Sequence, residues 1–349
     1  TQHEIFGQNY DFPELANGQT MAIGKRNSSG SHFFDGYMSE IYFIDGQALD
    51  SSYFGETNDN GVWIPKQYDG TYGNNGFLLQ FKQTGTSQNS SGIGADTSGN
   101  DNHFAVSNLA ATDVTTDTPT NNFATFNPLI AALTASGNAT VPTYSEGNCK
   151  TVTANSGKAG GSSTIQISRG KWYAEFEFDA TNNSGSTITS LIGVTDSPQE
   201  NARSFGKVGE RANDVAYANT GNKVIGDSST SYGNTYTTGD IIGVAVDLDN
   251  NAIYFSKNGT FQNSGDPTSG STKTGAIALT DPASTVEGGY YFAVGESTTE
   301  TSTHLANFGA AYPASISSGN SDGAGHGNFE YAVPSGYFAL CTKNLATYG

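Results

Sequence analysis

The feature that most constrains the fold is a strand–turn–strand pattern at residues 238–259, TGDIIGVAVDLDNNAIYFSKNG. Two runs rich in β-branched and aromatic residues, 241–246 and 253–255, flank a polar turn at residues 247–251. A second turn at residues 257–259 closes the unit, because Asn and Gly tolerate the left-handed backbone that tight hairpins need. The pattern therefore predicts an antiparallel hairpin, and Asp247 and its neighbours are interpreted as turn formers rather than calcium ligands.

The composition predicts short strands joined by many turns along the rest of the chain. Of its 349 residues, 44 are Gly and 11% are aromatic. The aromatic content separates the chain from disordered proteins, and the glycine content is typical of turn-rich β-proteins. Only residues 128–135 (PLIAALTA) have a helical pattern. We therefore expect an all-β protein, long enough for two domains with their own cores.

The charge balance excludes several classes of partner. The chain has 15 Lys and Arg against 33 Asp and Glu, a formal net charge of −18. Nucleic acid requires a basic surface and an anionic membrane attracts basic segments, so neither partner is expected. The sequence has no run of 18 apolar residues, so membrane insertion is not expected either.

The alternation of strand-like runs with polar, turn-rich stretches divides the chain into three parts. We expect one domain at residues 1–127, a linker at residues 128–143 and a second domain at residues 144–349. The linker follows a polar, turn-rich stretch that contains Pro119, which favours a fairly stiff connection.

The strand expected at residues 172–178 (WYAEFEF) has one apolar face and one acidic face. Glu175, Glu177 and Asp179 follow one another at every second residue, so an extended strand places all three carboxylates on one side. Jelly-roll glycosidases carry an acid and a nucleophile on one strand in this way, which leaves a catalytic hypothesis open. The simpler interpretation is a solvated outer face without catalysis, and it is the one we prefer.

Five ordered segments of the second domain resemble the SPRY (B30.2-type) family. They are GKWY at 170–173, IGV at 192–194, the hairpin at 239–259, YFAV at 291–294 and ANFG at 306–309. The resemblance implies a SPRY-like β-sandwich with a C-terminal extension at residues 144–349. It also implies that the protein is not an enzyme, since SPRY domains bind partners through loops at one edge of the sandwich.

The first domain resembles the laminin-G-like and concanavalin-A-like jelly roll. The matching residues are 34–41 (FDGYMSEI), followed by Ala48 and Leu49. This resemblance implies a jelly roll whose first strands are missing or are supplied elsewhere. The two resemblances together imply an all-β chain of two tandem antiparallel β-sandwiches.

The order of these pieces resembles virion and tail-associated proteins of marine bacteriophages. Further matching pieces are DTSGN at 96–100, DTPTNNFAT at 117–125 and GYFALCTKNL at 336–345. The resemblance implies an extracellular protein of the virion surface that attaches to a host-surface glycan or receptor, or stabilises the particle. Contacts with other virion proteins and a homo-oligomer are expected, because multivalency strengthens weak binding. A polysaccharide depolymerase and a secreted bacterial adhesin or matrix protein are the alternatives.

Six residues in the segment before the hairpin combine flat amphipathic rings with hydrogen-bonding groups, and are therefore candidate ligand contacts. They are Asn201, Arg203, Tyr217, Asn219, Tyr232 and Tyr236. Tyrosine supplies rigid contact area at a small entropic cost, which suits a sugar ligand. The alternative is that some of the tyrosines are core residues or anchor the loop.

A candidate calcium site lies in the loop DTSGND at residues 96–101. Asp96, Asn100 and Asp101 offer the hard oxygen ligands that Ca²⁺ prefers. The same residues are also typical of turns, so that interpretation stays open. No cofactor is otherwise required, because the five histidines lack the spacing of a zinc site.

The two cysteines, Cys149 and Cys341, lie near the two ends of the second domain. Two cysteines are too few for the disulfide framework of a small secreted scaffold. Two buried free thiols or one disulfide remain the alternatives.

Overall fold

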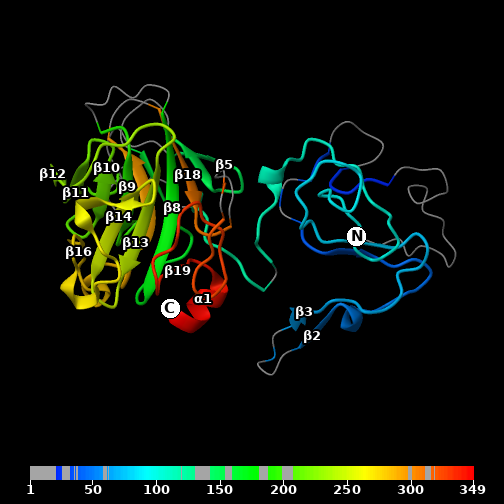
Figure 1. Cartoon of the computed structure of the whole chain (residues 1–349). Coiled ribbons are helices and arrows are strands. Elements are labelled where there is room, and N and C mark those ends of the chain that lie inside the picture. The colour runs from blue at the N-terminus through cyan, green and yellow to red at the C-terminus, as the bar shows by residue number, and fades with distance from the viewer. Residues whose placement is uncertain are drawn as a thin grey trace, which may run out of the picture. The chain divides into compact units, whose positions relative to one another are not determined.

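The computed structural model describes residues 21–25, 32–34, 36, 38–57, 61, 63–118, 120–129, 142–153, 159–180, 188–198, 207–297, 301–310, 316–317 and 319–349. The chain divides into two compact units, Thr1–Ser39 and Glu40–Gly349. Strands dominate the regular structure (Figure 1), so the predicted all-β class is confirmed. None of the described helices is long and apolar enough to span a membrane.

The N-terminal part of the larger unit contains two short antiparallel ribbons. In one ribbon β1 (Ile41–Phe43) pairs with β4 (Phe77–Leu79), and in the other β2 (Gly55–Thr57) pairs with β3 (Trp63–Pro65). The short 3₁₀-helices η2 (Ser51–Tyr53) and η3 (Ala111–Asp113) belong to the same stretch. The described residues here form no larger sheet, and the jelly roll stays a prediction.

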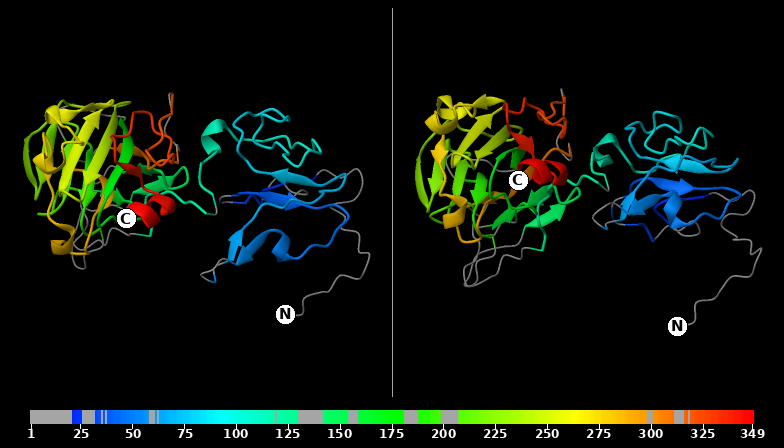
Figure 2. Two further views of the ribbon diagram at one scale, coloured as in Figure 1. Left: turned by 60° about the horizontal axis from the view of Figure 1, so that its bottom comes forward. Right: turned by 90° about the horizontal axis from the view of Figure 1, so that it is seen from below.

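A six-stranded sheet forms one layer of the C-terminal sandwich. Its order is β12-β11-β10-β9-β17-β7. The strands are β7 (Ala159–Ser162), β9 (Leu191–Thr195), β10 (Val215–Ala218), β11 (Asn222–Ile225), β12 (Ser228–Ser231) and β17 (Tyr291–Glu296). All neighbours are antiparallel, and Figure 2 shows the sheet from two further sides.

A nine-stranded sheet forms the second layer, in the order β15-β14-β13-β8-β18-β6-β5, with β16 added beside β14 and β19 beside β8. The strands are β5 (Thr143–Ser145), β6 (Lys150–Val152), β8 (Lys171–Ala180), β13 (Ile241–Asp247), β14 (Ala252–Lys257), β15 (Thr260–Phe261), β16 (Ile277–Ala278), β18 (Ser302–Asn307) and β19 (Phe338–Ala339). The short helices are η4 (Gln262–Ser264), η5 (Gly270–Thr272), η6 (Pro282–Ser284) and α1 (Thr342–Tyr348). The predicted hairpin is confirmed as β13 and β14.

The main core lies between the two sheets. The apolar face of β8 contributes Trp172, Ala174, Phe176 and Phe178, all fully buried, as the alternation predicted. Residues of the facing sheet, such as Phe292, complete this core. Because both sheets present alternating apolar side chains inward, the sequence period of two is sufficient to build this layer.

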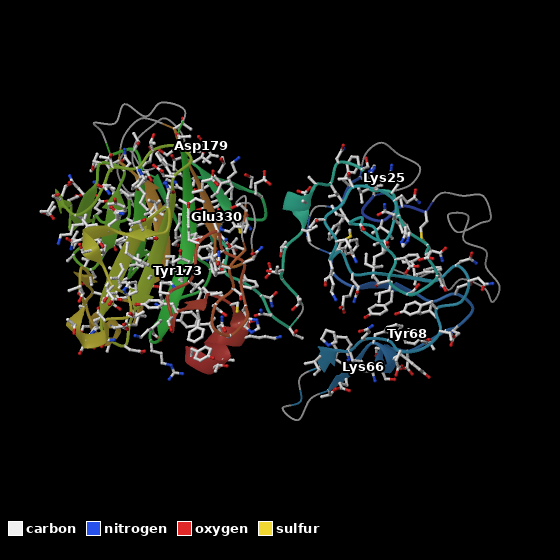
Figure 3. All side chains as sticks on the ribbon, in the orientation of Figure 1. Lys25, Lys66, Tyr68, Tyr173, Asp179 and Glu330 are labelled. Atoms are coloured by element: carbon white, nitrogen blue, oxygen red, sulfur yellow. The ribbon has the colours of Figure 1, made fainter. Side chains whose placement is uncertain are left out.

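A second core covers the opposite face of β8. Tyr173 lies there beside aromatic residues of the C-terminal extension, including Phe329 at 5.1 Å between ring centroids. Strand β19 runs parallel to β8, with Phe338 opposite Trp172. Figure 3 labels Tyr173 of β8 and Glu330 of the extension. The expectation of a solvated outer face is therefore wrong for this part of β8, because residues 319–341 return to cover it.

The stretch before the predicted linker belongs to the sandwich. Phe126 is fully buried in the main core and forms a bridge with Ser163, and Phe123 forms a bridge with Cys341. The boundary near residue 127 stays a prediction, and most of the predicted helix at 128–135 lies outside the described residues. Both cysteines are buried free thiols.

Candidate functional site

The three candidate tyrosines form a buried aromatic cluster instead of a binding surface. Tyr217 is fully buried, and the exposed fractions of Tyr236 and Tyr232 are 2% and 8%. The ring centroid of Tyr217 lies 5.3 Å from that of Tyr236 and 5.6 Å from that of Tyr232. The expectation of exposed rings is wrong, because these side chains fill the space between the sheets beside Phe255.

The hydroxyls of this cluster hold the segment that follows β12. The hydroxyl of Tyr217 donates to the carbonyl of Asn234, and that of Tyr236 donates to the carbonyl of Tyr217 at 3.0 Å. Burial raises the pKa of Tyr232 to about 12, so its hydroxyl stays protonated at neutral pH. The tyrosines therefore anchor the loop, which was the alternative interpretation of the sequence.

The remaining candidate ligand contacts do not join a site in the described structure. Asn219 is 2% exposed, and its side-chain oxygen accepts the backbone N–H groups of Thr189 and Ser190 at 3.0 and 3.2 Å. It therefore positions the start of β9. Asn201 and Arg203 lie outside the described residues.

The strand that precedes Tyr232 lies at an exposed edge of the sandwich. Strand β12 is the edge of the six-stranded sheet, and all four of its residues are exposed. Gly226 and Asp227 both have positive φ angles, 56° and 62°, which gives a two-residue type I′ turn between β11 and β12. In such a hairpin Ser228 hydrogen-bonds with its partner Ile225, so the backbone groups of Ser229 point away from β11.

The predicted calcium loop is organised by hydrogen bonds to Asp96. Its carboxylate is 5% exposed and accepts the backbone N–H groups of Leu78, Ser98 and Asn102, at 2.8 to 2.9 Å. These donors hold the pKa of Asp96 below its ordinary value, despite burial that acts in the opposite direction.

The other two candidate metal ligands serve the loop as well. The side-chain amide of Asn100 donates to the carbonyls of Gly73 and Gly76, at 2.6 and 2.9 Å. Asp101 is exposed, and its carboxylate lies 3.7 Å from the imidazole of His103. The expected convergence on calcium is corrected to a turn, because N–H donors surround Asp96. In the described part of the chain, no group of three or more His, Cys, Asp or Glu side chains is placed to hold a metal ion.

The acidic strand is divided between two environments. Glu175 is 1% exposed, and its carboxylate accepts the backbone N–H groups of Glu330 and Tyr331 and the hydroxyl of Tyr173. Burial raises the pKa of Glu175 above its ordinary value, although these donors act against the shift. Asp179 is exposed. The three carboxylates therefore do not share one solvent-facing surface.

Two buried polar groups were not predicted from the sequence. The Nε2 atom of His304 lies 2.8 Å from the hydroxyl of Ser190, deep between the sheets, and burial lowers the pKa of His304 to about 3. Asp214 accepts the backbone N–H groups of Gly209 and Arg211, and burial raises its pKa to about 6. Neither position has a sequence signal, since burial here depends on contacts between distant segments.

Asp247, the first residue of the turn, holds the β13–β14 hairpin in place. The carboxylate of Asp247 accepts both the backbone N–H and the side-chain amide of Asn250, at 3.0 and 2.8 Å. Its carboxylate also lies 2.9 Å from the ammonium group of Lys171 on β8. These contacts confirm that the Asp and Asn residues shape the turn.

The sequence from β8 to the segment after β15 identifies the domain. Residues 171–275 match the family model of the SPRY domain. The sandwich contains a SPRY domain. Within it, β8 is the first strand of the match and the β13–β14 hairpin lies in its last third. The C-terminal extension that covers Tyr173 lies outside the SPRY match.

Solved structures similar to this chain include another SPRY domain. The SPRY domain of human HERC1 is 16% identical, with a TM-score of 0.38, and the match covers 52% of this chain and 96% of that domain. Stonustoxin is 16% identical, with a TM-score of 0.35, and the match covers 53% of this chain and 27% of the toxin chain. No curated protein sequence matches the chain.

Proposed function

We propose that the protein is a non-catalytic binding protein whose SPRY domain holds a macromolecular partner. The observation that carries this proposal is the SPRY match at residues 171–275, since domains of this kind are interaction modules. The rigid sandwich supports the proposal, because two packed cores fix the surface that meets a partner.

The exposed edge of β12 is the surface that we propose for this contact. Edge strands offer unpaired backbone N–H and C=O groups to an extended segment of another protein. Strand β12 bears only Ser and Thr side chains, so it has none of the lysines or prolines that commonly block such edges. The buried tyrosines support this role by fixing the segment that follows the strand.

The depolymerase alternative has no favourable geometry. A glycosidase acid needs access to its substrate, whereas Glu175 is buried and binds three donors from the protein itself. The carboxylate of Glu175 therefore supports a structural role, which agrees with the non-catalytic proposal.

We further propose that the protein acts on the surface of a bacteriophage particle, in attachment to host cells. The support is the sequence resemblance in residues 96–100, 117–125 and 336–345, together with the acidic surface charge. Mass spectrometry of purified particles, with antibody labelling in electron microscopy, tests this placement. Absence of the protein from particles that are otherwise complete would leave the adhesin alternative.

Binding is tested with the full chain displayed on beads, against bacterial cell-surface proteins and a glycan array. Ser229→Pro removes a backbone N–H on the free edge of β12 and should abolish capture of a protein partner. Ser229→Ala keeps that N–H and should bind like the wild type. No capture of any surface component at high display density would contradict the binding proposal, and equal capture by both variants would exclude the β12 edge.

A further inference from the structure

Trp63 is an exposed aromatic residue on the β2–β3 ribbon, outside the SPRY domain. Its exposed fraction is 52%, whereas Trp172, the other tryptophan of the chain, is fully buried. Tryptophan is a large apolar residue that is highly buried on average, so a half-exposed one is an informative exception.

The ribbon holds the indole ring in one place. Trp63 pairs with Thr57, and its ring extends diagonally over Gly55 on the neighbouring strand. A Cβ atom at position 55 would lie only 2.0 Å from the Cζ2 atom of the ring. Glycine at this position therefore lets the indole lie against the backbone, which leaves the other ring face toward solvent.

The aromatic core of this region is complete without Trp63. It is built around Tyr68 and Tyr72, whose ring centroids lie 5.3 Å apart, and around Phe54 at 5.5 Å from Tyr68. Trp63 is not a member of this core. The exposed ring is therefore available for a ligand at no cost to the packing.

One hydroxyl group lies beside the exposed ring. Thr57, opposite Trp63 in the ribbon, is exposed and lies on the same face as the indole ring, whereas Glu56 points to the opposite face. Lys66, which Figure 3 labels in this part of the chain, is exposed, and its backbone N–H donates to the carbonyl of Phe54 at 2.9 Å, so its side chain lies on the face opposite the ring. A flat apolar ring with a hydroxyl group beside it suits an uncharged sugar, which has an apolar C–H face and a rim of hydroxyls.

From these contacts we propose that Trp63 is a stacking platform for an uncharged glycan. The net charge of −18 opposes acidic polysaccharides, so the ligand class is neutral hexose or pentose polymers. This site is separate from the β12 edge, so the two proposals can fail independently.

Fluorescence of the full chain tests the proposal directly, because Trp63 is the only exposed one of two tryptophans. The probes are laminarin, xylan, mannan and dextran, with alginate as an acidic control. At least one neutral glycan should shift the emission to shorter wavelength and reduce acrylamide quenching, while alginate should do neither. No spectral change with any neutral glycan, or a change with alginate alone, would overturn the proposal.

Retardation in native gels that contain the glycan provides a readout without tryptophan. Trp63→Ala should weaken binding by roughly ten-fold or more, as expected when a stacked ring is lost. Val286→Ala, which removes an exposed apolar side chain of the sandwich, should bind like the wild type. Gly55→Val keeps the indole but displaces it from the ribbon, and should weaken binding as well. Unchanged retardation of Trp63→Ala would contradict the site.

Discussion

The carboxylate of Glu175 accepts the backbone N–H of Tyr331 at 2.9 Å, across 156 residues of sequence. It also accepts the N–H of Glu330 at 2.8 Å, so one side chain of β8 fixes the C-terminal extension to the sheet. Both donors belong to the backbone, which means that the contact depends on the path of the chain and on no particular side chain of the extension.

Glu175→Gln should destabilise the fold by about 1–3 kcal/mol, because the amide nitrogen of glutamine would replace one carboxylate oxygen and face one of the two backbone N–H donors. The free energy of unfolding from denaturant titration gives this value, and hydrogen exchange should show the largest loss of protection in residues 319–341. Glu177→Gln on the same strand is the matched control and should cost less than about 0.5 kcal/mol. Equal losses of unfolding free energy in the two variants would contradict the role of Glu175 in holding the extension.

His304 should make the fold sensitive to acid. Burial lowers its folded pKa to about 3, against an unfolded value near 6.5, so the unfolded chain binds the extra proton between these limits. Its contribution to stability is complete above about pH 6.5, and is lost as the pH falls toward 3. At pH 5 the loss is roughly 2 kcal/mol, and it should be missing in His304→Gln. Parallel pH profiles of the two proteins would contradict this prediction.

Asp214 should have the opposite effect on stability, which it should lower as the pH rises. Burial raises its folded pKa to about 6, from an ordinary value of 3.8, so its stabilising contribution is present below pH 3.8 and is lost as the pH rises through 6. Asp214→Asn keeps an oxygen for the N–H groups of Gly209 and Arg211. Between pH 4 and 7 the variant should therefore gain roughly 2 kcal/mol in unfolding free energy relative to the wild type, measured by thermal or denaturant unfolding at each pH. If the difference in unfolding free energy between the variant and the wild type stays constant with pH, Asp214 is not the group that titrates.

Substitutions at two glycines should distinguish the cost of a steric clash from the cost of backbone strain. A Cβ at Gly193 on β9 would lie 1.9 Å from the carbonyl oxygen of Val215, so Gly193→Ala should cost about 1–3 kcal/mol or more through overpacking. Gly239 has a φ of +84° but open space around its Cβ position, so Gly239→Ala should cost only about 1–2 kcal/mol from the left-handed backbone. Denaturant midpoints compare the two, and a larger loss for Gly239→Ala would contradict the assignment of causes.

Local sequence patterns predicted the strands well. The alternation that starts at Trp172 identified β8 and its core face, and the Asp–Asn turn identified the β13–β14 hairpin. These features depend on neighbours along the chain, and on the period of two that any strand has. The SPRY resemblance agreed with the matched family at residues 171–275.

The same patterns could not predict what covers a strand. The polar face of β8 resembles a solvated surface in sequence, yet Glu175 is buried because residues 330 and 331 return to it. Tyr217 and Tyr236 lie in a stretch rich in turn residues, which suggested exposure, but distant strands enclose them. The position of the Trp63 ring depends on Gly55 in the paired strand. In each case the deciding contact is not adjacent in sequence.

The second core over Tyr173 has a consequence for the synthesis of the protein. Tyr173 is translated 156 residues before Phe329, the ring that covers it. At usual rates of translation this interval lasts roughly 8 to 30 seconds. During that time the second core has no cover from the extension, so a nascent chain exposes the apolar side chains of Tyr173, Ala245 and Tyr254 on the outer side of the sheet. We therefore expect chaperones to be needed between the emergence of the hairpin and that of Phe329.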